Sequence, residues 1–359
     1  MAALEIRRPA WLDDGDESWL RRMLLAPLVP VSWAYAAAAT LARRARSRRF
    51  RAPARLACRV VSVGNLHVGG SGKTPAAAWI AAQLRAAGHP VVLASRGYGR
   101  RGREPVTVVS DGRFVHATVA AGGDEPLLLA AHAPGVPVLV GRDRAFVGRR
   151  AIAAFGADVL VLDDGFQHHR LARDVEIVCF DGAGLGNGHV LPRGPLREPL
   201  GALAGADAVL VVDGPLAARD EERIRSHAPR AAWFAARRQA VSLRPLSGGA
   251  PVALDALREQ SIGLLSGIAR PASLRRTLEA LGARVVVERR FADHHRYRAR
   301  DLAGLAGEAQ LWVTTEKDAA KILPRWAGAA VVWVLAIELA PDDPRALLDW
   351  LERTLRTRR

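Results

Sequence analysis

The chain has 359 residues and an ordinary globular composition, with half of its residues apolar and a quarter charged. This length is enough for two domains of about 100–200 residues each. The net charge of +16 favours an anionic partner: nucleic acid, a phosphorylated substrate or an acidic membrane surface. The two isolated cysteines, Cys58 and Cys179, exclude a disulfide framework and a cysteine metal site, which fits a reducing compartment.

The N-terminal segment of residues 23–42 carries no charge and lies between Arg21–Arg22 and Arg43–Arg44. Its length could just span a bilayer. Pro27 and Pro30 interrupt it, however, and because both flanks are basic they define no orientation across a membrane.

Aromatic and basic residues around this segment suit a membrane surface. We therefore expect residues 1–50 to form an interfacial, membrane-associated segment on the cytoplasmic face of a membrane, bound peripherally or monotopically. A true span and a soluble buried helix are the alternatives. The anchoring residues are Trp11, Trp19, Trp33 and Tyr35, followed by Arg43, Arg44, Arg46, Arg48, Arg49 and Arg51.

A glycine-rich loop follows the apolar strand predicted at residues 59–63 and precedes a predicted helix at 76–84. This layout is typical of a phosphate-binding loop, in which backbone N–H groups and a helix N-terminus surround a polyphosphate. Lys73 is expected at the β- and γ-phosphates of ATP and the Thr74 hydroxyl at Mg²⁺. The strict pattern wants glycine where the chain has His67. The remaining loop residues are Gly69, Gly70, Ser71 and Gly72.

Lysine is rare in this arginine-rich chain, with only Lys73, Lys317 and Lys321 present. Retention of lysine at the loop position suggests that a compact ammonium is needed there rather than a planar guanidinium. The alternative is that one of the three lysines falls at the loop position by chance.

Apolar strands alternate with helices over residues 51–230, which predicts a parallel sheet covered on both faces. We expect an α/β fold with a P-loop NTPase-like domain at 51–230 and an extended linker at 231–250. A second, smaller α/β/α domain would occupy 251–359. The strands after the loop are expected at 91–94, 136–140, 159–162, 176–180 and 208–212.

Two acidic pairs are candidate site residues: one follows a predicted strand and the other follows two glycines. Asp163 and Asp164 end the strand at 159–162, where a carboxylate beside the phosphate loop would hold Mg²⁺ or its water. Asp124 and Glu125 open a helix; either Asp124 caps that helix, or it takes a proton from an acceptor hydroxyl.

Histidines and arginines complete the candidate site. In the FADHHRY segment, Asp293 could orient His294 or share a proton with it. Metal binding by these histidines together with Gln167-His168-His169 is the rival reading, although neither pair has zinc-site spacing. Arg193 and Arg197, in a rigid proline-rich segment, could face phosphate, or could belong to an ordinary surface loop.

Together these motifs resemble those of the tetraacyldisaccharide 4′-kinases, the lipid A 4′-kinases of Gram-negative bacteria. The resemblance covers about residues 15–355 and includes the variant loop with His67. The motifs occur in the family's order: GNLHVGGSGKTP, SRGYGR, GGDEP, DDGFQHHRL, LPRGPLREPL, FADHHRY and TTEKDAAK.

The resemblance implies transfer of the γ-phosphoryl group of ATP to the 4′-hydroxyl of a tetraacylated glucosamine disaccharide 1-phosphate, forming lipid IVA. It implies two α/β/α domains whose second member completes an active-site cleft. It makes Asp124 the general base and His294, chosen over His295, its partner. Lys73 and Thr74 match the phosphate and Mg²⁺ positions, Asp163 and Asp164 match the acidic strand end, and Glu125, Gln167 and Asp293 match supporting positions.

Two other functions compete with this one. A P-loop GTPase or ATPase switch would predict an N-K-x-D base-specificity motif, which the chain lacks. A basic nucleic-acid-binding ATPase would leave the apolar N-terminal segment without a role, so we expect no nucleic acid partner.

Overall fold

The computed structural model describes residues 18–48, 53–102, 104–182 and 184–358, and these form two compact units. The first unit runs to Arg237 and also contains Leu339–Arg359, whereas the second is Arg238–Glu338. The chain passes from one unit to the other within strand β8 (Ala232–Pro245) and returns within β12 (Val331–Pro341). The residues that were expected to form an extended linker thus include a long strand.

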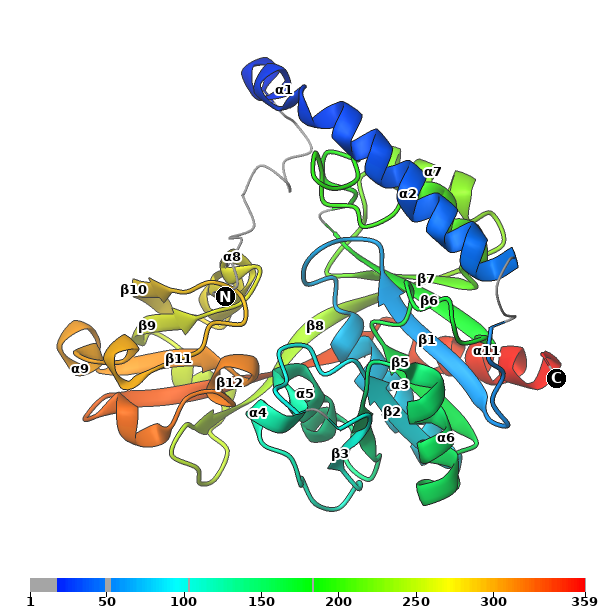
Figure 1. Ribbon diagram of the computed structural model, residues 1–359. Coiled ribbons are helices and arrows are strands. Elements are labelled where there is room, and N and C mark those ends of the chain that lie inside the picture. The colour runs from blue at the N-terminus through cyan, green and yellow to red at the C-terminus, as the bar shows by residue number, and fades with distance from the viewer. Residues whose placement is uncertain (1–17, 49–52, 103, 183, 359) are drawn as a thin grey trace. The chain divides into compact units, whose positions relative to one another are not determined.

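A mostly parallel sheet forms the centre of the first unit (Figure 1). Its strand order is β3-β4-β2-β5-β1-β6-β7, followed by the first half of β8; among the described pairings from β3 to β8, β3 alone is antiparallel to its neighbour. The strands are β1 (Arg59–Asn65), β2 (Val91–Ser95), β3 (Thr107–Ser110), β4 (Val138–Val140), β5 (Val159–Asp163), β6 (Val175–Asp181) and β7 (Ala208–Val212).

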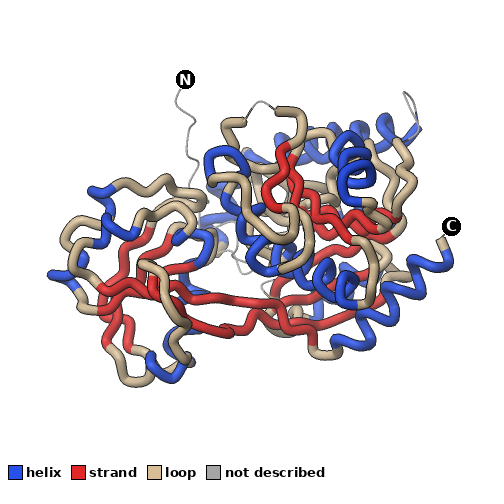
Figure 2. The backbone as a smooth tube through the Cα atoms, turned by 90° about the horizontal axis from the view of Figure 1, so that it is seen from below, coloured by secondary structure: helices blue, strands red, loops and turns tan. Residues whose placement is uncertain are grey.

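Helices cover both faces of this sheet (Figure 2) because successive apolar side chains of each strand point to opposite faces. In β1, Val61 and Val63 pack with α3 (Lys73–Ala86) and α5 (Asp124–His132), while Val60 packs on the other face with α6 (Arg144–Phe155). The remaining elements of this unit include α4 (Val119–Gly122), α7 (Ala218–His227) and the 3-10 helix η2 (Leu200–Gly205).

The C-terminal helix α11 (Pro344–Thr357) belongs to the first unit, although it follows the second unit in sequence. Leu351 and Leu355 lie in the same core as residues of β1 and α3. Sequence order had grouped residues 251–359 together, and the structure divides that range at Leu339.

Two helices form the described part of the N-terminal segment: α1 (Trp19–Leu25) and α2 (Leu28–Arg48). The chain turns at Pro27, while Pro30 lies in the first turn of α2, where its missing N–H costs no helical hydrogen bond. In the described ranges we find no helix with the length and apolar character needed to cross a membrane. Trp11, Arg49 and Arg51 lie outside the described residues.

A parallel sheet with the order β10-β9-β11-β12 forms the second unit. Helix α8 (Pro271–Ala280) buries Leu274 and Leu278 against one face, and Trp312 fills the other. The strands are β9 (Ser261–Ser266), β10 (Arg284–Arg290) and β11 (Leu311–Thr315), and the short helices are η3 (Leu254–Leu257), η4 (Ala299–Asp301), α9 (Leu305–Glu308), α10 (Glu316–Ala319) and η5 (Pro324–Ala327). The predicted α/β class with a large parallel sheet and a smaller second part is confirmed.

Candidate nucleotide and acceptor site

The predicted phosphate loop joins β1 directly to the N-terminus of α3, as the glycine pattern requires. Gly72 precedes the helix with a φ of 81°, and a Cβ atom there would lie 3.0 Å from Val212 Cγ1. Both the left-handed backbone and the close approach therefore favour glycine. Ser71 is buried, and its hydroxyl has no hydrogen-bond partner among the residues that the structure describes.

His67 takes the place of a loop glycine and has a structural partner. It forms an antiparallel bridge with Leu196, and Val68 N–H donates to the Pro195 carbonyl at 2.8 Å. Arg197 N–H in turn donates to the Leu66 carbonyl at 2.7 Å. The proline-rich segment thus pairs with the backbone of the phosphate loop and holds it in place.

Lys73 lies nearly buried among carboxylates. Its Nζ is 4.0 Å from Asp164 Oδ1. Burial lowers the pKa of Lys73, but the negative charges of Asp164, Glu125 and Asp163 outweigh this effect and raise the pKa above its ordinary value. The ammonium therefore stays charged at neutral pH, as a phosphate ligand must.

Asp163 is fully buried at the C-terminal end of β5. The Thr74 hydroxyl donates to its Oδ1 at 3.2 Å and the Ser95 hydroxyl to its Oδ2 at 3.3 Å. Burial, reinforced by the charge of Glu125, raises the pKa of Asp163 to about 7 despite the opposing charge of Lys73. A divalent cation would favour the ionised carboxylate here.

Asp164 turns toward different partners. Arg197 Nη1 donates to its Oδ1 at 3.0 Å, and the same nitrogen is 3.4 Å from Gln167 Oε1. Burial raises the pKa of Asp164, but the Lys73 and Arg197 cations outweigh this and hold the pKa below its ordinary range. Gln167 Nε2 donates to the carbonyl of Asn65 at 2.9 Å, which ties this group to the start of the phosphate loop.

These oxygen donors fit a hard divalent cation. The Thr74 hydroxyl and the carboxylates of Asp163 and Asp164 suit Mg²⁺ chemically. Among the described residues, no group of three or more histidine, cysteine, aspartate and glutamate side chains could hold a metal alone.

The GGDEP segment reaches the same site. Asp124 is the first residue of α5 and is buried, while Gly123 occupies the N-cap position. Asp124 Oδ1 accepts a hydrogen bond from Glu125 N–H at 3.0 Å. Helix α5 packs against α3, which begins at Lys73, and the charge of Glu125 raises the pKa of both Lys73 and Asp163.

Arg193 and Arg197 have different surroundings. Arg197 faces Asp164, whereas Arg193 is buried and its N–H donates to Ser32 Oγ on α2 at 2.9 Å. The sequence reasoning missed Ser95 and Arg144, both of which belong to this region. Burial lowers the pKa of Arg144 to about 10 against the opposing charges of Asp163 and Asp164. Ser95 opens the SRGYGR motif but was not singled out as a site residue, and Arg144 lies in none of the motifs; the tertiary structure places both beside Asp163.

The FADHHRY segment lies in the second unit, and its two histidines have different contacts. His294 Nε2 is 3.2 Å from Lys317 Nζ, and that ammonium donates to Asp293 Oδ1 at 3.0 Å. His295 instead contacts Asp301 Oδ2 at 3.0 Å through Nε2 and stacks on Phe291 with ring centroids 4.5 Å apart.

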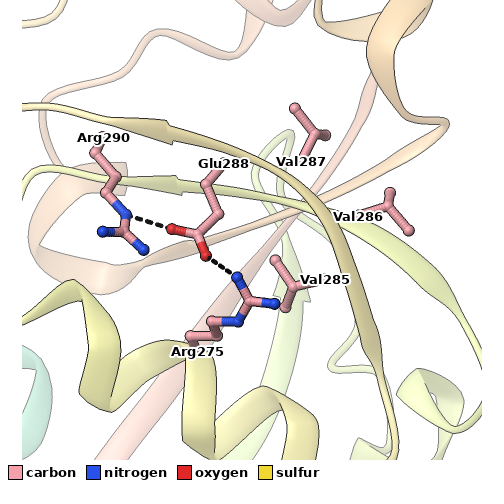
Figure 3. A pocket seen from close by; sticks show the side chains of 6 residues that line it. All are labelled: Arg275, Val285, Val286, Val287, Glu288 and Arg290. Carbon is pink, nitrogen blue, oxygen red and sulfur yellow. Dashed lines mark hydrogen bonds and ion pairs between the residues drawn. The ribbon is translucent and has the colours of Figure 1, made fainter.

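An open pocket of about 320 Å³ lies elsewhere in the second unit and contains none of the predicted site residues (Figure 3). Glu288 lies between two arginines in this pocket: Arg275 Nη1 donates to Glu288 Oε1 at 2.6 Å, and Arg290 Nε donates to Glu288 Oε2. The remaining residues that line this pocket are Val285, Val286 and Val287.

A parallel sheet with this loop and an acidic strand end defines the P-loop class of nucleotide-binding proteins. The chain belongs to the tetraacyldisaccharide-1-P 4′-kinase family, whose model matches residues 24–356.

Curated relatives and a solved structure agree with this assignment. The chain is 46% identical over 329 residues to a tetraacyldisaccharide 4′-kinase from Anaeromyxobacter dehalogenans, covering 85% of this chain and 83% of that protein. It is 43% identical to the enzyme of the same name from Syntrophus aciditrophicus, over 79% and 81% of the two chains. LpxK from Aquifex aeolicus, solved in complex with ATP, has a TM-score of 0.74 and 30% identity over 93% of this chain and 100% of that one.

Proposed function

We propose that this chain transfers the γ-phosphoryl group of ATP to the 4′-hydroxyl of a tetraacylated glucosamine disaccharide 1-phosphate, forming lipid IVA in lipid A biosynthesis. Membership of the kinase family supports the reaction. The observation that carries the site assignment is the joining of Lys73, Thr74, Asp163 and Asp164 around one phosphate loop.

The phosphate loop binds and orients the nucleotide in this proposal. Backbone N–H groups of Gly69, Gly70, Ser71 and Gly72 surround the phosphates, and the charged Lys73 lies at the β- and γ-phosphates. Bound Mg²⁺ would neutralise charge between these phosphates, with Thr74, Asp163 and Asp164 as its protein ligands or the ligands of its waters. Arg197 holds Asp164 in the required position, Gln167 accepts from the same Arg197 nitrogen, and the backbone of Arg193 fixes the segment that carries Arg197.

Asp124 accepts the proton of the attacking hydroxyl, with Glu125 beside it and with His294 as its partner. Its burial and its position at a helix start keep the carboxylate oriented. Phosphoryl transfer depends mainly on positioning and charge neutralisation, so one oriented base is sufficient for the acceptor. Asp293 supports His294 by accepting its backbone N–H at 3.0 Å.

We further propose that α1 and α2 hold the protein at the anionic surface of the inner membrane, on the cytoplasmic side, where ATP and the lipid substrate meet. Large apolar side chains on these helices are exposed, which is unusual for a surface facing only water. They are Trp19, Leu20, Met23, Leu24, Val31, Trp33, Tyr35 and Leu41.

The decisive test is transfer of labelled phosphate from ATP, with Mg²⁺, to the detergent-solubilised disaccharide 1-phosphate. We expect labelled lipid from the wild-type protein and none from Lys73→Met. Correctly folded wild-type protein that labels no lipid would overturn the proposal. Stimulation of ATP hydrolysis by nucleic acid instead of lipid would favour a nucleic-acid-dependent ATPase.

A further inference from the structure

The TTEKDAAK segment has no role in the reaction as described above, yet it forms a firmly held structure. Thr315 Oγ1 accepts from Asp318 N–H at 3.1 Å and caps α10. The buried Asp318 carboxylate also accepts from Gly267 N–H at 2.9 Å and pairs with Lys321 at 3.1 Å. The start of α10 is therefore fixed to the carboxyl ends of β9 and β11.

Lys317 extends from this fixed helix to the FADHHRY segment. Its Nζ is 3.0 Å from Asp293 Oδ1 and 3.2 Å from His294 Nε2. A compact ammonium has three donors and can serve both acceptors from one nitrogen, which a planar guanidinium cannot do in the same geometry. This explains why a chain that otherwise uses arginine has lysine here.

The contact determines where the imidazole carries its proton. An ammonium only donates hydrogen bonds, so Nε2 of His294 accepts from Lys317 at 3.2 Å, whereas the Oδ2 atom of Asp293, at 3.8 Å from Nε2, is too distant for a hydrogen bond. A ring that accepts at Nε2 is neutral and carries its proton on Nδ1. His294 also has a left-handed backbone with a φ of 60°, supported by the hydrogen bond from its N–H to Asp293.

We propose that Lys317 is a positioning residue that holds His294 as the neutral Nδ1–H tautomer. This inference rests on the proposed function, in which His294 acts as the partner of Asp124. In this tautomer the ring offers a hydrogen-bond donor at Nδ1 and remains uncharged. His295 does not share this role, because Asp301 and Phe291 hold its ring.

The first experiment is independent of activity. In protein labelled with ¹⁵N in the histidine rings, the nitrogen resonances distinguish a protonated nitrogen from an unprotonated one, and His294→Gln assigns the signals. We expect an unprotonated Nε2 and a protonated Nδ1 for His294, with this pattern lost in Lys317→Met. A wild-type ring protonated on Nε2 would overturn the proposal, even if Lys317→Met fails to fold.

The second experiment measures turnover. We expect Lys317→Met to lower kcat by about tenfold or more while KM for ATP stays within about twofold, because the loss concerns only the acceptor side. Arg325→Met, which removes an exposed cation from the same unit, serves as the control and should keep wild-type kinetics. Unchanged kcat in Lys317→Met would refute the positioning role. A wild-type protein without kinase activity would instead refute the proposed function, while the ring signals would still decide the tautomer.

Discussion

Asp164 and His294 share a backbone conformation that few residues other than glycine adopt. Their φ angles are 55° and 60°, and they are two of four such non-glycine residues in the described ranges. Aspartate and histidine tolerate this region better than most residues, but it persists only where the surroundings enforce it. Arg197 holds Asp164 and Lys317 contacts His294, so both strained positions lie where the proposed chemistry needs a fixed side chain.

Asp124 can be tested against a second aspartate at a helix start. Asp143 is the true N-cap of α6, accepting from the N–H groups of Ala145 and Phe146, whereas the N-cap before Asp124 is Gly123. We expect Asp124→Asn to lower kcat by about 10²- to 10⁴-fold with little change in ATP affinity, because only proton transfer is lost. Asp143→Asn should retain turnover, since asparagine caps a helix as well as aspartate. Steady-state kinetics and nucleotide titration measure both; equal losses of turnover and affinity in Asp124→Asn would contradict its role as base.

Strand β6 contains a buried carboxylate whose ionisation opposes folding. Burial raises the pKa of Glu176 to about 7, although Arg173 Nε lies 2.8 Å away. Because the folded pKa is above the unfolded one, the contribution of Glu176 to the free energy of unfolding falls as pH rises from about 4.5 to 7. Glu176→Gln lacks this ionisable group. We therefore expect the unfolding free energy of the variant, measured relative to wild type, to rise by on the order of 2 kcal/mol from pH 5 to pH 8. Urea denaturation at both pH values measures the difference.

Glu198 is the matched control, because folding shifts its pKa in the opposite direction. Burial raises its pKa, but His169 and Arg43 outweigh this and hold the pKa below its ordinary value. Its ionised form therefore stabilises the fold above the unfolded pKa and loses this effect only as pH falls through the lower folded value. We expect Glu198→Gln to be destabilised throughout pH 5–8. A relative gain for Glu198→Gln on raising the pH, or none for Glu176→Gln, would show that the assigned directions are wrong.

Helix α2 is anchored to the first unit by two polar contacts, whereas both α1 and α2 expose large apolar side chains. Ser32 Oγ donates to the Val190 carbonyl at 3.0 Å, and Arg43 pairs with Glu198 at 3.0 Å, while Leu24 and Trp33 are 77% and 68% exposed. Burying such side chains in a membrane is worth about 1.5–3 kcal/mol each. We expect Leu24→Glu with Trp33→Glu to weaken binding to vesicles of anionic lipid by at least about tenfold.

Phe114 offers a control for the vesicle experiment, since it is 69% exposed and lies outside these helices. Phe114→Glu should bind vesicles as the wild type does in the same flotation assay. Equal weakening by Phe114→Glu and by the double variant would assign the binding to a different surface.

The strand, the turn and the strand end around the phosphate loop could be predicted, because each is specified by residues that are neighbours in sequence. The apolar run before Gly64, the glycines up to Gly72 and the acidic end of β5 each identify a strand, a turn or a strand end within a few residues. The partner of His67 could not be predicted, because its bridge to Leu196 joins residues far apart in sequence. The distinction between His294 and His295 likewise needed Lys317 and Asp301, which lie on other elements.

At the scale of the whole molecule, the end of the chain completes the unit that binds the nucleotide. Leu347, Leu351 and Leu355 are buried on one side of α11, and this helix contacts α3 and β6. An amphipathic helix gives no sign of which of two sheets it will cover, so sequence order placed it with residues 251–359. Helix α11 covers the sheet of the first unit because β12 returns the chain there. We therefore expect the stability of the phosphate loop to depend on residues of α11.

Leu351→Ala tests this dependence. The side chain is fully buried in the core shared with β1 and α3, so its truncation should cost about 2–5 kcal/mol. We expect faster hydrogen exchange in β1 and α3, with β9 and β11 unchanged, because the cavity opens in the first unit only. Leu323→Ala, at a 41% exposed leucine of the second unit, should leave exchange in β1 and α3 as in the wild type. Exchange measured by mass spectrometry after a common labelling time separates the two units, and an unchanged β1 in Leu351→Ala would show that α11 does not stabilise the phosphate loop.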